Sequence, residues 1–158
     1  MVSAPLVSRR RNGDSKARLR LWVRLLRATR LVESETRERF KSKFNVTLPR
    51  FDVMAALYRK PDGMLMSEIS RFLLVSNGNV TGIVDRLVQD GFIVRSQRNG
   101  DRRTSFVRLT AKGHAAFVEM ATAHERWINE LLGGVKPRDA EHLSASLKSF
   151  RSDWEGDA

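Results

Sequence analysis

The chain has 158 residues, of which 41% are hydrophobic and 30% charged, so it is long enough to bury one core. It contains no cysteine, which excludes disulfides, thiolate metal sites, cysteine nucleophiles and thiol-based redox sensing. No apolar run is long enough to cross a bilayer, and no apolar segment of the signal-peptide kind follows the basic residues near the start. We therefore expect a cytoplasmic protein that makes no use of a membrane.

The charge is strongly one-sided, with a formal net value of +11 and an isoelectric point near 11.1. Such an excess favours polyanionic partners, with nucleic acid first and anionic lipid or phosphorylated ligands after it. A basic surface that serves only solubility is the alternative.

The N-terminal part divides into two segments. Residues 1–18 show no hydrophobic periodicity and carry several arginines, which predicts a flexible basic arm that either touches the DNA backbone or is a solvated tail. From residue 19 to residue 45 apolar side chains recur at steps of three and four, which predicts a long amphipathic helix. Arg37 and Lys41 are one turn apart on it, as are Arg39 and Lys43, so each pair shares a surface.

Short elements follow over residues 48–110. Pro49 suits the first turn of a helix, and a break at residues 75–77 separates two further short helices, the arrangement of a helix-turn-helix. Residues 92–96 and 106–109 have strand character and flank a long polar segment, which predicts a β-hairpin with a basic tip. The fold class expected is mainly α with a small β-hairpin.

Two more helices are expected at the C-terminal end. One runs from Ala111 to the pair Gly133-Gly134, and the last begins at Pro137. The last helix has one apolar stripe, formed by Leu143, Leu147, Phe150 and Trp154. This stripe either meets a second subunit or packs against the helix that begins at Ala111. Without internal repeats or a low-complexity linker, residues 19–158 form one domain.

The second helix of the helix-turn-helix is the candidate for reading DNA. Such a helix can lie in the major groove and present the side chains at its N-terminal end to base edges. Asn can bond to adenine, Ser and Thr can bond to bases or phosphates, and Val or a Thr methyl can touch a thymine methyl. The alternative is that these polar residues only cap a helix. The candidate DNA contacts here are Ser76, Asn77, Asn79, Val80, Thr81 and Arg86.

The hairpin tip supplies a second candidate contact. Arg98, Arg102 and Arg103 can reach phosphates or enter a narrow minor groove. Asp101 can hold Arg103 in place through a charge-assisted hydrogen bond. A solvated charged turn is the alternative.

Four motifs within residues 48–113 resemble those of the MarR family, the multiple antibiotic resistance regulators. They are Val84-Asp85-Arg86-Leu87, Asp90-Gly91-Phe92-Ile93-Val94-Arg95, Asp101-Arg102-Arg103 and Val107-Arg108-Leu109-Thr110-Ala111-Lys112-Gly113. The resemblance implies a winged helix-turn-helix at 48–110 and an obligate homodimer, held by helices within 19–45 and 111–158. Gly78 and Asn79 are not typical of the family, so no operator sequence is implied. We expect a repressor that binds a pseudo-palindromic operator in double-stranded DNA and is associated with the nucleoid.

The resemblance also implies a small anionic or phenolic effector between the dimerisation helices and the DNA-binding lobe. Two effectors are considered: an aromatic carboxylate held by one Arg, and an aromatic acyl-CoA thioester whose phosphates neutralise basic residues that otherwise face DNA. For the apolar candidates, core packing is the alternative role. The candidate ligand contacts are Trp22, Arg37, Arg39, Phe40, Phe44, Phe51 and Met54.

An enzyme is not expected. The three histidines lack metal-ligand spacing, and there is no Gly-rich phosphate loop or recognisable Ser-His-Asp order, so we expect no catalytic residue, metal or cofactor. The rival function is a basic protein that binds nucleic acid without sequence preference, either architectural or RNA-binding. RNA readers expose aromatic residues for base stacking, and the hairpin tip has none.

Overall fold

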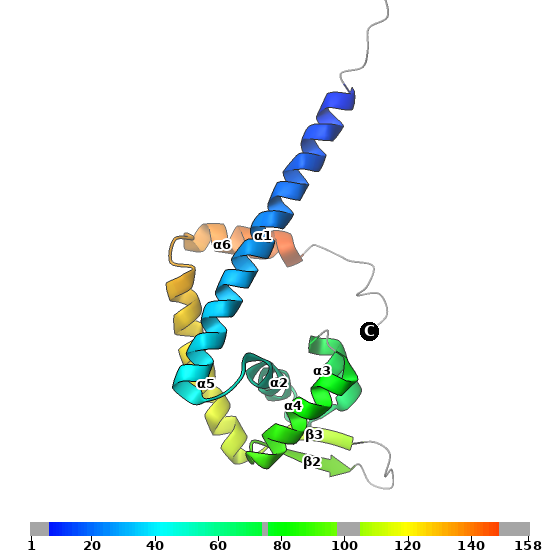
Figure 1. Cartoon of the computed structure of the whole chain (residues 1–158), viewed down its shortest axis with the longest axis vertical. Helices are drawn as coiled ribbons and strands as arrows, with labels where there is room; N and C mark the ends of the chain where they lie inside the picture. Colours follow the sequence, from blue (N-terminus) through cyan, green and yellow to red (C-terminus); the bar gives the residue numbers. More distant parts are fainter. Residues whose placement is uncertain (1–6, 74–75, 98–104, 149–158) are drawn as a thin grey trace, which may run out of the picture.

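The computed structural model describes residues 7–73, 76–97 and 105–148 (Figure 1). It confirms a mainly helical fold with a small antiparallel sheet. The elements run in the order α1 (Val7–Phe44), α2 (Leu48–Tyr58), β1 (Met64–Leu65), α3 (Met66–Leu73), α4 (Asn77–Gln89), β2 (Ile93–Gln97), β3 (Ser105–Leu109), α5 (Ala111–Leu131) and α6 (Pro137–Lys148).

The first helix is longer than predicted. It begins at Val7 rather than at residue 19, so the flexible arm expected over residues 1–18 is wrong from Val7 onward, and residues 1–6 lie outside the described part. The arginines of this segment, together with Lys16 and Ala17, favour helix, and an existing helix extends at low cost. Hydrophobic periodicity does not reveal this part of the helix, because its residues 13–18 are exposed and carry no apolar stripe. The helix ends at Phe44, and the next residue, Asn45, has a left-handed φ of 53°.

One end of the core lies where α1, α2 and α5 meet. Phe40 is completely buried, and its ring centroid lies 4.5 Å from that of Phe51, 5.2 Å from that of Trp127 and 5.7 Å from that of His124. Phe51 also stacks on Phe117 at 5.5 Å. One aromatic cluster therefore joins the C-terminal end of α1 to α2 and α5.

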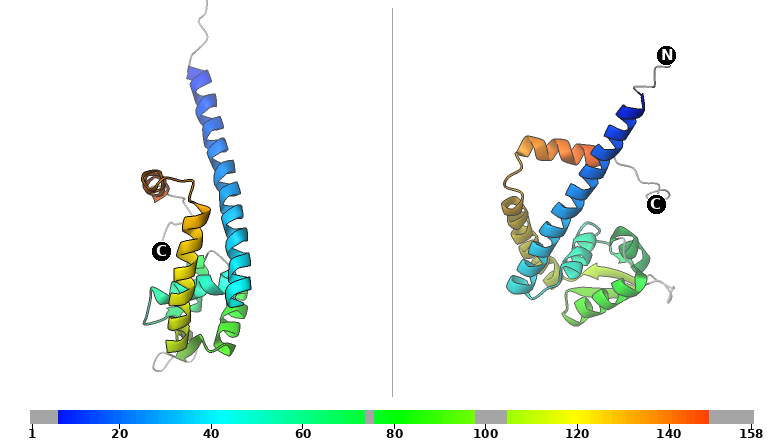
Figure 2. Two further views of the ribbon diagram at one scale, coloured as in Figure 1. Left: turned by 90° about the vertical axis from the view of Figure 1, so that its left-hand side faces the viewer. Right: turned by 45° about the horizontal axis from the view of Figure 1, so that its top comes forward.

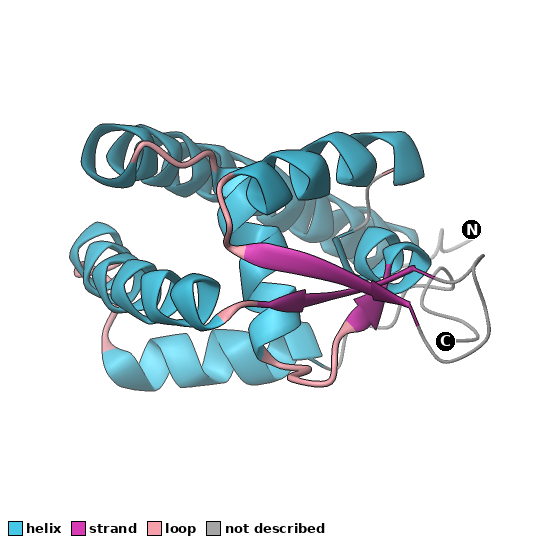
Figure 3. Ribbon diagram, turned by 90° about the horizontal axis from the view of Figure 1, so that it is seen from below, coloured by secondary structure: helices cyan, strands magenta, loops and turns pink. Residues whose placement is uncertain are grey.

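The lobe formed by α2, α3, α4 and the strands lies at one end of α1 (Figures 1 and 3). The strand order is β1-β3-β2 with antiparallel pairing, which confirms the predicted hairpin. Val107 pairs with Met64 on one side and with Arg95 on the other. Val107, Met64 and Ile93 are buried on one face, while Arg108, which follows Val107 and therefore lies on the opposite face, is exposed, so the sheet covers the core with one face.

The second helix of the predicted helix-turn-helix is α4. Val80, Val84 and Leu87 lie on one face of it and are completely buried. These spacings of four and three residues place all three against the lobe. Gly91 follows the end of the helix, and its φ of 75° is a left-handed conformation that suits glycine.

The start of α5 is fixed by a tight contact with the residue before β2. The Thr110 hydroxyl donates to the Gly91 carbonyl at 2.7 Å and accepts from the Gly113 amide at 3.0 Å. The Thr110 amide donates to the Phe92 carbonyl at 3.0 Å. A Cβ on Gly113 would lie 1.9 Å from that same carbonyl oxygen, so only glycine fits there.

Two segments leave apolar side chains uncovered. The N-terminal part of α1 extends beyond the other elements (Figure 2) and exposes Trp22 by 57% and Leu31 by 64%. In α6 no residue is buried, and Leu143 and Leu147 are each half exposed. Packing of this stripe on α5 is thus not seen for the described residues, and Phe150 and Trp154 lie outside them. Within the described ranges, no helix is both long and apolar enough to span a membrane.

Candidate nucleic-acid interface

The first half of α4 presents a polar, open surface. Ser76, Asn79 and Thr81 are exposed, and the side chain of Asn77 lies outside the described set. Gly78 and Gly82 are exposed as well, and a Cβ at either would meet nothing within 4 Å. This part of the helix can therefore approach another molecule with its backbone.

The N-terminal end of α4 also has amide groups to offer. The Ser76 side chain makes no capping hydrogen bond, although its carbonyl accepts from the amides of Asn79 and Val80. The first amides of the helix, before that of Asn79, have no intrahelical acceptor and lie at the positive end of the helix dipole. Phosphate groups bind well at such an end. The alternative in which Ser76 serves as a side-chain cap does not apply.

Val80 requires a correction. It was expected to contact a thymine methyl, but its side chain has 0% exposure and belongs to the core. Its position is one helical turn before that of Val84, so burying the apolar face of α4 turns both inward. A base contact from Val80 would require α4 to leave the lobe.

Arg86 lies apart from the other α4 candidates. Seven residues after Asn79, it is about 10 Å further along the helix, and its Nε lies 3.7 Å from Asp90 Oδ1. The hairpin candidates Arg98, Asp101, Arg102 and Arg103 all lie outside the described residues.

Sequence reasoning missed one contact that positions the hairpin. Asp85 of α4 accepts a hydrogen bond from Arg95 of β2, and both side chains are partly exposed. Both residues stand in the motifs quoted above, but nothing in their spacing showed that they pair. The ion pair ties the wing strand to the helix beside it.

Comparison with known proteins decides the family. A family model described as MarR family matches residues 46–105. The uncharacterized HTH-type transcriptional regulator YkoM of Bacillus subtilis is 34% identical over 116 residues, which make up 73% of this chain and 73% of YkoM. The chain belongs to the MarR family. As a member it is a DNA-binding transcriptional regulator and not an enzyme.

Solved structures agree with this membership. A MarR family transcriptional regulator from Silicibacter pomeroyi superposes with a TM-score of 0.72 at 35% identity, covering 85% of this chain and 93% of that one. A mutant MarR from E. coli, complexed with operator DNA, gives a TM-score of 0.71 at 23% identity, covering 81% and 91%. The winged-helix fold of the MarR family is thus confirmed for this chain.

The predicted ligand residues do not form one group. Trp22 stands 18 residues before Phe40 on α1, about 27 Å away along the helix axis. Phe40, Phe51 and Met54 are at most 6% exposed and fill the core. Phe44 is partly buried and borders a cavity.

The two predicted arginines are engaged with glutamates on the surface. Arg37 Nη2 lies 2.8 Å from Glu33 Oε1, one turn earlier on α1. Arg39 Nη1 lies 2.7 Å from Glu130 Oε2 of α5. Each arginine already has a carboxylate partner, whereas a site for a ligand carboxylate would require a free arginine.

A cavity of about 400 Å³ lies between α1, α2 and α5, and we call it the inter-helix cavity. Sequence reasoning did not single out its polar residues, since Asp52 and His124 come from different helices. Burial, together with the nearby Glu33 carboxylate, raises the pKa of Asp52 to about 6, and burial lowers the pKa of His124. The cavity lining comprises Ala28, Thr29, Val32, Glu33, Thr36, Leu48, Asp52, His124, Ile128 and Leu132.

The raised pKa of Asp52 predicts a pH-dependent stability. The folded state holds this proton up to about pH 6, whereas the unfolded carboxyl loses it near pH 3.8. Between these values the folded state binds more protons, so the contribution of Asp52 to stability falls as pH rises from about 4 to 6. We expect Asp52→Asn to remove this loss. In urea unfolding, the free energy of unfolding of the variant minus that of the wild type should therefore be larger at pH 7 than at pH 4.

Glu33→Gln is the companion variant for this test. It removes the neighbouring carboxylate and is expected to lower the pKa of Asp52, which would shift the loss to lower pH. A constant difference between wild type and Asp52→Asn across the whole range would show that Asp52 titrates normally.

Proposed function

We propose that the chain is a ligand-responsive repressor that binds a pseudo-palindromic operator as a homodimer, with α4 in the major groove. The observation that carries this proposal is the first half of α4, which is polar, exposed and open at two glycines while its other face is buried. Ser76, Asn77, Asn79 and Thr81 would supply contacts to bases and phosphates. Arg98, Arg102 and Arg103 of the wing tip would add contacts to phosphates or in the minor groove, and Asp101 would hold Arg103 in place.

The uncovered apolar side chains support a dimer. Those on α1 and α6 belong to the segments that the family resemblance assigns to dimerisation. A two-fold axis between two such chains would place the two α4 helices about one turn of DNA apart, with half-site centres roughly 10 bp from each other.

For the effector we propose an aromatic acyl thioester, with its acyl group in the inter-helix cavity. The lining of that cavity contains Glu33 and Asp52 but neither Lys nor Arg. A free aromatic carboxylate would face two acidic side chains there, whereas the acyl group of a thioester is uncharged. The aromatic cluster lies directly behind the cavity wall, because His124 belongs to both.

The effector proposal is tested with the simplest matched pair, benzoyl-coenzyme A and benzoate. We expect calorimetric titration to show saturable binding of the thioester and at least tenfold weaker binding of the acid. Stronger binding of benzoate would contradict the thioester and favour the free carboxylate.

The DNA proposal is tested with Asn79→Ala. The reference measurement is the fluorescence anisotropy of labelled DNA from upstream of this chain's own gene, with scrambled DNA as competitor. We expect the variant to lose about 1–3 kcal/mol of discrimination if Asn79 bonds to one base, while its affinity for scrambled DNA stays near that of the wild type. Asn129→Ala, on the exposed surface of α5, is the matched control. It should change neither the discrimination between the two DNAs nor the affinity for scrambled DNA.

The same measurement distinguishes a sequence-specific regulator from a protein that binds nucleic acid without sequence preference. A basic protein without sequence preference would bind operator and scrambled DNA alike, and its affinity would fall steeply with salt in both cases. Equal losses on both DNAs for Asn79→Ala would contradict a base contact.

A further inference from the structure

We infer that this chain has a second small-molecule site, which binds an organic phosphate at the junction of α1, α2, α4 and α5. The site is a cavity of about 660 Å³, which we call the basic cavity. It is distinct from the inter-helix cavity, with which it shares no lining residue. Its lining consists of Lys41, Phe44, Asn45, Val46, Thr47, Arg50, Arg86, Gln89, Asp90, Phe92 and Lys112.

The charge of this lining is strongly positive. Lys41, Arg50, Arg86 and Lys112 each come from a different helix, and Asp90 is the one acidic residue among them. Four cations gathered around one carboxylate repel one another, and an anion carrying two or more charges relieves this repulsion.

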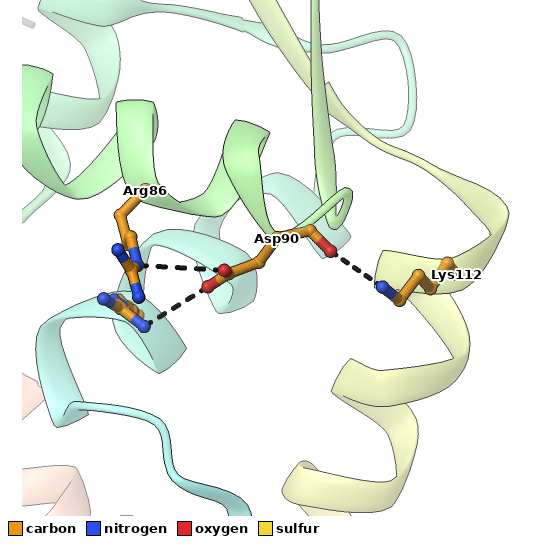
Figure 4. A network of polar contacts seen from close by, with 4 residues as sticks. Arg86, Asp90 and Lys112 are labelled. Carbon is orange, nitrogen blue, oxygen red and sulfur yellow. Dashed lines mark hydrogen bonds and ion pairs between the residues drawn. The ribbon is translucent and has the colours of Figure 1, made fainter.

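The Asp90 carboxylate does not use all the hydrogen-bond donors of the basic side chains. Arg50 Nη1 lies 3.4 Å from Asp90 Oδ2 and Arg86 Nε lies 3.7 Å from Asp90 Oδ1, both longer than the 2.7–2.9 Å that is typical of charge-assisted hydrogen bonds. Lys112 Nζ donates to the Asp90 main-chain carbonyl at 2.8 Å instead of to its carboxylate (Figure 4). Each guanidinium has five N–H donors, so donors remain for a ligand.

Lys41 is the most available of the four. It is exposed, and within the described ranges it forms no ion pair with a carboxylate. Arg50 is the best enclosed, with its side chain only 20% exposed. Together they place one exposed and one enclosed positive charge in the cavity.

The rest of the lining explains why the phosphate should carry an organic group. Phe44, Phe92 and Val46 form an apolar part of the wall, and Lys112 Nζ lies 5.0 Å from the centre of the Phe92 ring. Apolar walls strengthen nearby ionic contacts by excluding water. The volume falls within the range of cavities that hold small organic ligands, about 300–1,000 Å³.

The test uses pyrophosphate as the minimal probe, titrated calorimetrically into the full chain at constant ionic strength. We expect saturable binding by the wild type, at least tenfold weaker binding by Lys41→Gln, and severalfold tighter binding by Asp90→Asn, which removes the competing carboxylate. Arg138→Gln, on exposed α6, removes the same charge outside the cavity and should change the affinity less than twofold.

Three results of the pyrophosphate titrations would overturn the inference. The first is the absence of saturable binding, and the second is weaker binding by Asp90→Asn. The third is an equal loss of pyrophosphate affinity in Lys41→Gln and Arg138→Gln, which would mean diffuse attraction to a basic protein. ADP and coenzyme A then identify the source of the phosphate: we expect at least one to displace pyrophosphate, and displacement by neither would contradict an organic phosphate.

DNA is the other polyanion that could use these side chains. Without added anion, Lys41→Gln should bind operator as tightly as Arg138→Gln does. A tenfold weaker operator affinity for Lys41→Gln, with no pyrophosphate binding by the wild type, would make the basic cavity a contact for the DNA backbone.

Discussion

Gly113→Ala is expected to lower the free energy of unfolding by about 3 kcal/mol, the upper end of the usual cost of overpacking. A Cβ at this position would lie 1.9 Å from the Phe92 carbonyl oxygen and 2.8 Å from its carbonyl carbon, and both are main-chain atoms that cannot rotate away. To accommodate it, the start of α5 must move from β2, which breaks the Thr110 hydrogen bonds to Gly91 and Phe92. Urea unfolding at fixed protein concentration measures the loss.

Gly134→Ala is the matched control for this prediction. It makes the same change in the turn before α6, where a Cβ would meet nothing within 4 Å. We expect it to alter stability by no more than about 0.5 kcal/mol, as for other surface substitutions. Similar values for the two variants would show that the contact at Gly113 relaxes without cost.

Phe40→Ala is expected to cost about 3–5 kcal/mol, the range for truncating a buried aromatic residue. The ring is completely buried and touches the rings of Phe44, Phe51, His124 and Trp127. Its loss leaves a cavity between α1 and both of its neighbours, which no single side chain can fill.

Phe72→Ala provides the comparison for Phe40→Ala. Phe72 lies on α3 with 48% exposure and is covered on one side by Arg59, whose guanidinium carbon is 5.6 Å from the ring centre. We expect a loss of no more than about 1 kcal/mol there. Equal losses at the two positions would mean that the aromatic cluster does not join α1 to the lobe.

The sequence predicted those parts of the fold that local patterns determine. The break before α4, the hairpin strands and the start of α5 all depend on neighbouring residues, and each lies within one residue of its predicted place. The start of α1 was missed because exposed helix leaves no apolar period to detect.

Site residues were harder to predict, because burial and partners depend on contacts distant in sequence. Val80 lies between polar candidates at the start of α4, but its side chain packs into the core. Asp52 with Glu33 and His124, and Lys41 with Arg50, Arg86 and Lys112, come together only when separate helices pack. No spacing rule links such residues along the chain.

The unbroken length of α1 has a mechanical consequence. One straight helix carries Phe40, which is fixed in the lobe, and Trp22, which projects beyond it, so the two behave as points on a rigid rod about 27 Å apart. A tilt of only about 5° at the fixed point displaces the far point by roughly 2 Å over that distance. Small rearrangements around the aromatic cluster are therefore amplified along α1. A partner bound to the projecting part of α1 would be displaced by the resulting change in the orientation of the helix.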